Sequence, residues 1–187
     1  MNENYTKTRV IVECALLIAL GTILAQVKIF RMPSGGSVTL LSMLPFIMIS
    51  YRHGMKWGSL AAMANVMLQI ILGGLYTPPA GTILALIGSV LFDYVLAYLV
   101  LAYAPAFSKK IKNKALGVAF GTAMVCFLRF ICAFISGFII WGSLADGVWA
   151  ACIYSLSYNA AYMVPESLLT VVASYFLCKK APVLFIN

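Results

Sequence analysis

Residues 114–141 read KALGVAFGTAMVCFLRFICAFISGFIIW, and this stretch decides the class of fold. Between Lys114 and Trp141 the only charged residue is Arg129, so the segment is long and apolar enough for a helix that crosses a bilayer, which needs about 20 residues. The whole chain has this character: of 187 residues, 63% are hydrophobic and 10% are charged, and the mean hydropathy is +0.99. Soluble domains carry roughly 25% charged residues. We therefore expect an integral membrane protein.

Charged residues, glycines and prolines divide the chain into six apolar segments, because a spanning helix tolerates such interruptions mainly at its ends or inside protein. The expected spans are residues 10–30, 38–52, 56–74, 81–104, 114–141 and 148–178. We predict an all-α integral membrane protein in which residues 1–187 form a single domain of six transmembrane helices.

The positions of Lys and Arg predict how this domain lies in the membrane, since both are enriched in cytoplasmic loops. Only Lys28 and Arg31 lie on one side of the membrane, at the end of the first span and just after it. Ten others lie on the side of the two termini: Lys7, Arg9, Arg52, Lys56, Lys109, Lys110, Lys112, Lys114, Lys179 and Lys180. Both termini are therefore expected to be cytoplasmic, with the loops at 33–36, 73–80 and 142–147 facing outward. The net charge of +8 then marks the cytoplasmic face and does not indicate nucleic-acid binding.

Several chemistries find no support in the sequence. The five cysteines have no CxxC spacing and no neighbouring His, so we expect neither a metal site nor a cofactor. There is no G-x-x-x-x-G-K-[ST] loop for ATP, and no H-E-x-x-H, G-x-S-x-G or close pair of acids. We do not expect an enzyme. If the chain transports a solute, the energy comes from an ion gradient or from another polypeptide.

Apart from the Lys and Arg residues at the ends of the spans, four charged residues fall within them: Glu13, Asp93, Arg129 and Glu166. Each costs about 2.5 to 3.5 kcal/mol on insertion scales, so each calls for an explanation. Glu13 lies near the cytoplasmic end of its helix and can reach the interface. We expect Arg129 and Glu166 to form a structural pair, with a role in binding a substrate as the alternative. Asp93 has no cationic residue within two helical turns, so we expect its carboxylate to bind an external cation or hydrogen-bond donor. A hydrogen bond between Asp93 and a neighbouring helix is the structural alternative.

The last span carries an unusual density of phenols and amides. Tyr154, Tyr158 and Tyr162 recur every four residues and share one helical face, and Asn159 lies about 100° round from Tyr158. An aromatic belt at the membrane interface accounts for the tyrosines. An aromatic belt accounts poorly for Asn159. A carboxamide within a span needs hydrogen-bond donors and acceptors, which a heteroaromatic ring supplies.

Weaker signals come from the fifth span, the first outer loop and the first span. Ser136 and Trp141 lie toward the outer end of the fifth span, where Trp141 suits an interfacial anchor as well as a ligand wall. Gly36 lies in a loop that either bends closely over a ligand or forms a simple turn. Ala15 and Ala19 make a small-xxx-small pattern that lets another helix approach closely.

Four strings together resemble one family. They are PSGGSVTLLSMLPF at 33–46, Asp93–Tyr94, FISGFIIWG at 134–142 and YSLSYNAAYMVPE at 154–166. The chain resembles, over nearly its whole length, the ThiT family, the thiamine-specific substrate-binding subunit (S component) of energy-coupling factor transporters.

This resemblance implies a six-helix protein of the bacterial cell membrane that binds thiamine near its outer face. It also implies association with a transmembrane coupling subunit and two ABC-type ATPase subunits. The family's substrate-binding positions match Asp93, Tyr94, Trp141, Tyr154 and Asn159, and its docking patch on the first helix matches Ala15 and Ala19.

The chain departs from the family pattern at three positions. Ala133 stands where well-known members have His, and Gly36 and Asn65 stand where some have Trp. Two alternatives to thiamine import remain open at this point. One is an S component for a related pyrimidine, thiazole or other vitamin. The other is a secondary carrier that uses Asp93 as a proton site.

Overall fold

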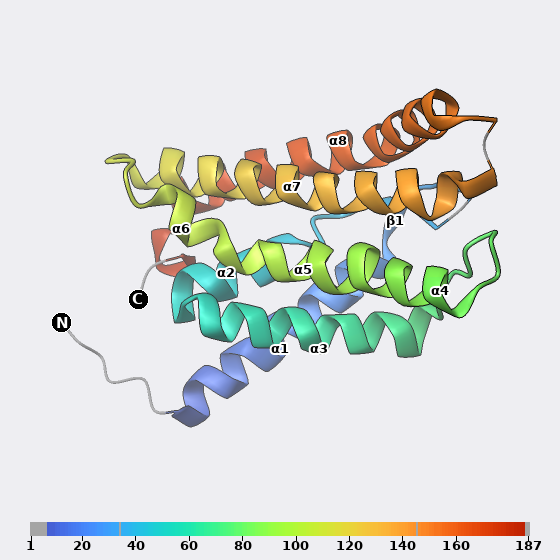
Figure 1. Ribbon diagram of the computed structural model, residues 1–187. Coiled ribbons are helices and arrows are strands. Elements are labelled where there is room, and N and C mark those ends of the chain that lie inside the picture. The colour runs from blue at the N-terminus through green and yellow to red at the C-terminus, as the bar shows by residue number, and fades with distance from the viewer. Residues whose placement is uncertain (1–6, 34, 145, 186–187) are drawn as a thin grey trace.

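The protein is described by a computed structural model covering residues 7–33, 35–144 and 146–185. Residues 1–6, 34, 145, 186 and 187, which include one position in each of two expected outer loops, lie outside the described residues. The described residues form a bundle of helices with a small β-hairpin (Figure 1). The first half contains α1 (Lys7–Gln26), β1 (Lys28–Arg31), β2 (Ser37–Thr39), α2 (Leu44–His53) and α3 (Met55–Gly73).

The second half begins with one long helical stretch of changing pitch and ends with two long helices. The stretch comprises α4 (Ile83–Ser89), the π-helical η1 (Val90–Leu96), α5 (Ala97–Leu99), the 3-10 turn η2 (Val100–Tyr103) and α6 (Ala104–Ser108). It is followed by α7 (Lys114–Ile139), the turn η3 (Trp141–Leu144), α8 (Val148–Lys180) and the turn η4 (Pro182–Leu184).

The all-α membrane architecture predicted from the sequence is confirmed. Among the described residues, five helical segments are long and apolar enough to cross a bilayer: Lys7–Gln26, Met55–Gly73, Ile83–Ser108, Lys114–Ile139 and Val148–Lys180. Their apolar side chains point outward over much of the surface; Leu84, for example, is 81% exposed. An outward-facing apolar surface of this extent suits contact with lipid.

The sixth helical segment, α2, differs from the expected span 38–52. It begins at Leu44 and has 10 residues, so it is about 15 Å long, roughly half the thickness of the hydrocarbon core. Every residue from Leu44 to Ser50 is buried, which makes α2 an internal helix surrounded by the others. The residues before it form β2, which pairs antiparallel with β1; the residues opposite one another include Arg31 and Ser37.

The two ends of the bundle match the expected sidedness. The start of α1, the end of α8 and the lysine-rich turn between α6 and α7 lie at one end, on the left of Figure 1. The hairpin, the α3–α4 loop and the α7–α8 turn lie at the other end. The Lys and Arg distribution therefore agrees with the arrangement of the helices, and the cavity described below is lined by segments from the end expected to face outward.

The main core lies around α2. Phe46 and Ile47 of α2 pack with Ala62 and Val66 of α3 and with Tyr98 of α5, and the rings of Phe46 and Tyr98 meet edge to face at 6.2 Å between centroids. This packing fixes the inner faces of α3 and α5.

At the expected cytoplasmic end, Glu13 joins α1 to α2. Its carboxylate accepts hydrogen bonds from Arg9 Nε at 3.2 Å and Arg52 Nε at 2.7 Å, and His53 Nε2 lies 3.0 Å away. Arg52 also donates to the carbonyl of Val183, so the C-terminal turn is tied to the same cluster. Glu13 thus lies at the expected end of its helix, paired with Arg9 of the same helix and with Arg52 of α2.

Candidate ligand-binding site

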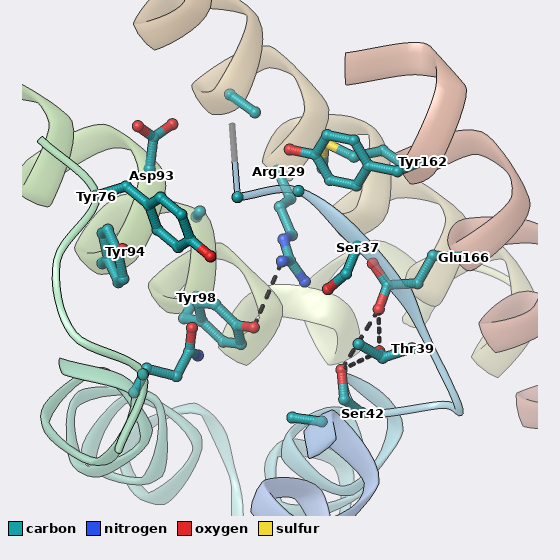
Figure 2. Close-up of a pocket in the computed structure, with 18 of the residues that line it drawn as sticks. Ser37, Thr39, Ser42, Tyr76, Asp93, Tyr94, Tyr98, Arg129, Tyr162 and Glu166 are labelled. Carbon is teal, nitrogen blue, oxygen red and sulfur yellow. Dashed lines mark hydrogen bonds between the residues drawn. The ribbon is translucent and has the colours of Figure 1, made fainter. Parts of the chain in front are cut away.

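A cavity of about 230 Å³ is lined by the end of α1, the β1–β2 hairpin, α3, the stretch from α4 to α5, α7 and α8. Figure 2 shows that charged and phenolic side chains from several of these elements converge on it. Of the residues singled out in the sequence as substrate-binding, six line the cavity: Gly36, Asp93, Tyr94, Trp141, Tyr154 and Asn159. A polar cavity inside an otherwise apolar bundle is the expected form of a ligand site.

Asp93 lies in the π-helical stretch η1, a conformation that often marks functional sites. Its Oδ2 atom accepts three hydrogen bonds, from Ser89 Oγ at 2.8 Å, Ser136 Oγ at 2.7 Å and Trp141 Nε1 at 3.2 Å. Among the described residues no hydrogen bond ends on Oδ1. The structural alternative for Asp93, a bond to a neighbouring helix, is thus present on one oxygen, while the other oxygen remains available to a ligand.

Ser136 is fully buried on α7 and is absent from the cavity lining, so it orients Asp93 and is shielded from a ligand. Trp141 lines the cavity and also donates to Asp93, which gives it a role beyond that of an interfacial anchor. Tyr94 lines the same wall, together with Tyr76 from the α3–α4 loop (Figure 2).

Two glycines in the β1–β2 loop allow the loop to lie close to aromatic rings. Gly35 has a φ of +105°, which favours glycine, and a Cβ placed on it would come within 2.9 Å of the Tyr76 ring. A Cβ on Gly36 would come within 2.5 Å of the Tyr162 ring. The loop therefore packs against both the α3–α4 loop and α8, beyond what a simple turn requires.

The tyrosines of α8 form a continuous aromatic wall. The rings of Tyr154 and Tyr158 stack at 5.6 Å between centroids, and those of Tyr158 and Tyr162 meet edge to face at 6.1 Å. All three line the cavity. The helical face predicted from their spacing is therefore turned toward the cavity.

Asn159 is only 5% exposed, and its amide is engaged within the protein. Its Nδ2 donates to the carbonyls of Ala133 at 3.2 Å and Ser155 at 2.9 Å, and its Oδ1 accepts from Tyr162 Oη at 2.9 Å. Asn159 thus links α7 to α8 and orients the Tyr162 ring. Direct contact between Asn159 and a ligand stays a prediction.

Arg129 and Glu166 line the cavity but do not form the expected pair. Arg129 Nη2 donates to Tyr98 Oη at 3.4 Å, with the guanidinium 4.5 Å from the centre of the Tyr98 ring. Glu166 instead accepts hydrogen bonds from Thr39 and, at 3.4 Å, from Ser42 (Figure 2). The prediction of an Arg129–Glu166 ion pair was wrong because the segment around β2 brings its own hydroxyl donors to Glu166.

Comparison with known proteins identifies the family. A family model described as "Thiamine transporter protein (Thia_YuaJ)" matches residues 11–186. The chain belongs to this thiamine transporter family. It is 30% identical to the thiamine transporter ThiT of Bacillus subtilis (strain 168), in an alignment over 193 residues that covers 97% of this chain and 96% of the relative.

The fold is also shared with a solved structure of ThiT from Listeria monocytogenes. The TM-score is 0.76 with 22% sequence identity, covering 95% of this chain and 97% of that one. The match to the thiamine transporter family confirms the resemblance drawn from the sequence strings. Together with the long apolar helices, it identifies a multi-pass protein of the cell membrane, in a family of transporters.

Sequence reasoning missed several residues of this thiamine transporter family member. Ser89 precedes Asp93 by four residues, so helical spacing alone would have found it. Gln69 lies one helical turn after Asn65 in the apolar α3 and carries the same kind of signal, and both residues line the cavity. Tyr98 had no such signal, because its role depends on the approach of Arg129 from α7.

Ala15 and Ala19, expected to dock a partner, lie away from the cavity. Both are exposed on α1, on a helix whose neighbouring side chains Leu16 and Ile23 are 66% and 63% exposed. A docking role for Ala15 and Ala19 stays a prediction.

Proposed function

We propose that this chain binds thiamine in the cavity around Asp93 and acts as the substrate-binding subunit of an importer. The family match and the B. subtilis relative, named a thiamine transporter, support the choice of ligand. The observation that carries the proposal is the Asp93 carboxylate, which is held by three donors on Oδ2 beside a wall of aromatic rings.

Thiamine has two parts that fit this chemistry. Its aminopyrimidine carries an amino group that donates to the free Oδ1 of Asp93, and a carboxylate makes such a bond stronger than a neutral acceptor does. Its thiazolium ring is a cation, and an aromatic face attracts a desolvated cation by up to about 2 kcal/mol. Trp141, Tyr94 and Tyr154 supply aromatic faces in the lining.

Energy for import comes, in this proposal, from partner proteins. The sequence has no phosphate-binding loop for ATP, so a transmembrane coupling subunit and two ABC-type ATPases supply the hydrolysis. The exposed patch around Ala15 and Ala19 is the surface that we assign to the coupling subunit, because small residues let helices approach closely. The chain itself binds and releases its ligand without chemical change.

The proposal is tested by titrating the purified protein with thiamine, its separate pyrimidine and thiazole moieties, and biotin, while following tryptophan fluorescence. Trp141 contacts Asp93 directly, so occupation of the cavity is expected to change its emission. Saturable binding of thiamine, tighter than that of either moiety, is the expected result. Tighter binding of one moiety or of biotin would overturn the choice of ligand.

A transport assay tests the role of the partners. Vesicles that contain the chain alone are expected to accumulate no thiamine, and vesicles that also contain the coupling subunit and ATPases are expected to accumulate it when ATP is present. Uptake by the chain alone that a protonophore abolishes would instead identify a proton-coupled carrier.

A further inference from the structure

Lysines crowd the turn between α6 and α7, at the expected cytoplasmic end of the bundle. Residues 109–114 read KKIKNK, and the exposed lysines of this turn are Lys109, Lys110, Lys112 and Lys114. Two more lysines, Lys179 and Lys180, are the last residues of α8. Like charges this close repel one another, so an anion bound among them relieves the repulsion.

The described part of the protein supplies no anion to these lysines. None of the ion pairs between described residues involves a lysine, and Glu13 pairs with basic side chains of α1 and α2. Asp93 and Glu166 line the cavity near the other end of the bundle, and Asp146 lies in the α7–α8 turn at that end. The counter-charge for the lysine-rich turn therefore has to come from outside the described residues.

A second cavity, of about 180 Å³, lies beside this turn. Its apolar lining includes Ile111, Val118 and Phe185, and Lys114 is its charged lining residue among those described. The two hydroxyl groups in the lining are already engaged: Tyr51 Oη donates to the carbonyl of Ala104 at 3.2 Å, and Ser108 Oγ donates to that of Pro105 at 2.9 Å. Positive charge is thus the main attraction that this cavity offers to a ligand.

Packing around the cavity brings the two groups of lysines to one place. Val118 of α7, Cys178 of α8 and Phe185 belong to one apolar cluster, and Cys178 directly precedes the two lysines that end α8. The outer surface of α7 next to the cavity is apolar, since Leu116 and Phe120 are both exposed. A charged headgroup site therefore adjoins a helix surface suited to acyl chains.

We propose that the cavity between the α6–α7 turn, α2 and Phe185 binds the headgroup of an anionic phospholipid from the cytoplasmic leaflet. The phosphate lies at Lys114 with Lys112 beside it, and the acyl chains follow Leu116 and Phe120. The cytoplasmic leaflet carries anionic lipids, and basic pockets between helices on that side of a membrane suit their headgroups. The site lies away from the cavity around Asp93 and does not depend on which solute that cavity binds.

The test measures lipid binding to the purified protein in a neutral detergent by native mass spectrometry. Wild type is titrated with a short-chain phosphatidylglycerol and with phosphatidylcholine of the same chain length. We expect one phosphatidylglycerol to bind saturably, at least about tenfold more tightly than phosphatidylcholine.

Two double variants remove the same number of exposed lysines from different places. Lys112→Gln with Lys114→Gln is expected to raise the Kd for phosphatidylglycerol about tenfold or more, because each lysine near an anionic lipid contributes about fivefold. Lys7→Gln with Lys56→Gln changes lysines outside the cavity lining, and its Kd is expected to stay within about threefold of wild type.

A second pair of variants tests the cavity without changing any charge. A Cβ on Gly117 meets Ser108 at 3.5 Å and Ile111 at 3.6 Å, which are ordinary contact distances. Gly117→Ala is therefore expected to keep the affinity for phosphatidylglycerol to within about threefold. Gly117→Leu fills part of the cavity and is expected to weaken that affinity about tenfold. Melting temperatures without added lipid check that each variant is folded.

Several results would overturn the lipid site. One is equal affinity for phosphatidylglycerol in wild type, in the variant of Lys112 and Lys114, and in Gly117→Leu. Another is phosphatidylcholine that binds as tightly as phosphatidylglycerol. Displacement of phosphatidylglycerol by an equal concentration of inorganic phosphate would identify a soluble anion as the occupant. A variant of Lys112 and Lys114 that keeps its lipid affinity but no longer co-purifies with the coupling subunit would assign these lysines to a protein partner.

Discussion

Replacing Asp93 with Asn tests the carboxylate while leaving its surroundings nearly unchanged. The carbonyl oxygen of Asn can take the place of Oδ2 and accept from Ser89, Ser136 and Trp141, so the local packing survives. What changes is the atom at the position of Oδ1, which becomes an amide nitrogen and can no longer accept from the ligand. Asp93→Ala, by contrast, also leaves those three donors without their acceptor.

The size of the effect follows from the strength of the bond that is lost. A hydrogen bond to a charged group contributes about 1.5 to 3 kcal/mol, and a typical neutral one about 1 kcal/mol. Losing the charged bond to thiamine therefore raises Kd by roughly 10- to 100-fold, since about 1.4 kcal/mol corresponds to tenfold. Asp93→Ala is expected to weaken binding by more than about tenfold as well.

Isothermal titration of wild type and Asp93→Asn with thiamine measures this difference in Kd. Melting temperatures of the two proteins in the same detergent check that the fold is kept. Ser136→Ala is the matched control: it removes one donor to Oδ2 without touching the ligand, and we expect a smaller rise in Kd. An Asp93→Asn protein that melts normally and binds thiamine within about twofold of wild type would refute the role of the carboxylate.

Three further substitutions give distinct outcomes. Gly36→Val places a side chain against the Tyr162 ring, where even a Cβ would come within 2.5 Å. This variant is expected to weaken thiamine binding in titrations. Unchanged affinity for thiamine would show that the Tyr162 ring moves freely. Ala15→Trp is expected to leave thiamine binding intact but to prevent co-purification with the coupling subunit; a stable complex would exclude this patch as the docking face. Arg52→Ala removes the partly buried bond to Glu13 and is expected to cost about 1 to 3 kcal/mol of stability, seen as a lower melting temperature, with no change in Kd for thiamine.

The sequence predicted five of the six spans to within about four residues at each end, because their apolarity is a local property of composition. It predicted the sidedness because Lys and Arg sort to one face. It did not predict the hairpin, since the pairing of β1 with β2 depends on contacts between separate segments. For the same reason the second span was expected at residue 38, although α2 begins at Leu44 after the strand.

The candidate site was predicted in part. Asp93 stood out because a lone carboxylate in a lipid-spanning segment needs a reason, and the structure places it in the cavity beside Trp141. The predicted pairing of Glu166 with Arg129 was wrong because opposite charges on two helices do not determine whether their side chains face each other. Only the folded chain brings Thr39 to Glu166 and Tyr98 under Arg129.

The most direct test of the account is an experimental structure of the protein with thiamine bound. We expect the aminopyrimidine in the cavity, with its amino nitrogen about 2.7 to 2.9 Å from an Asp93 carboxylate oxygen and the thiazolium against an aromatic ring. Thiamine bound elsewhere on the protein, or in the cavity with no polar atom within about 4 Å of Asp93, would contradict it.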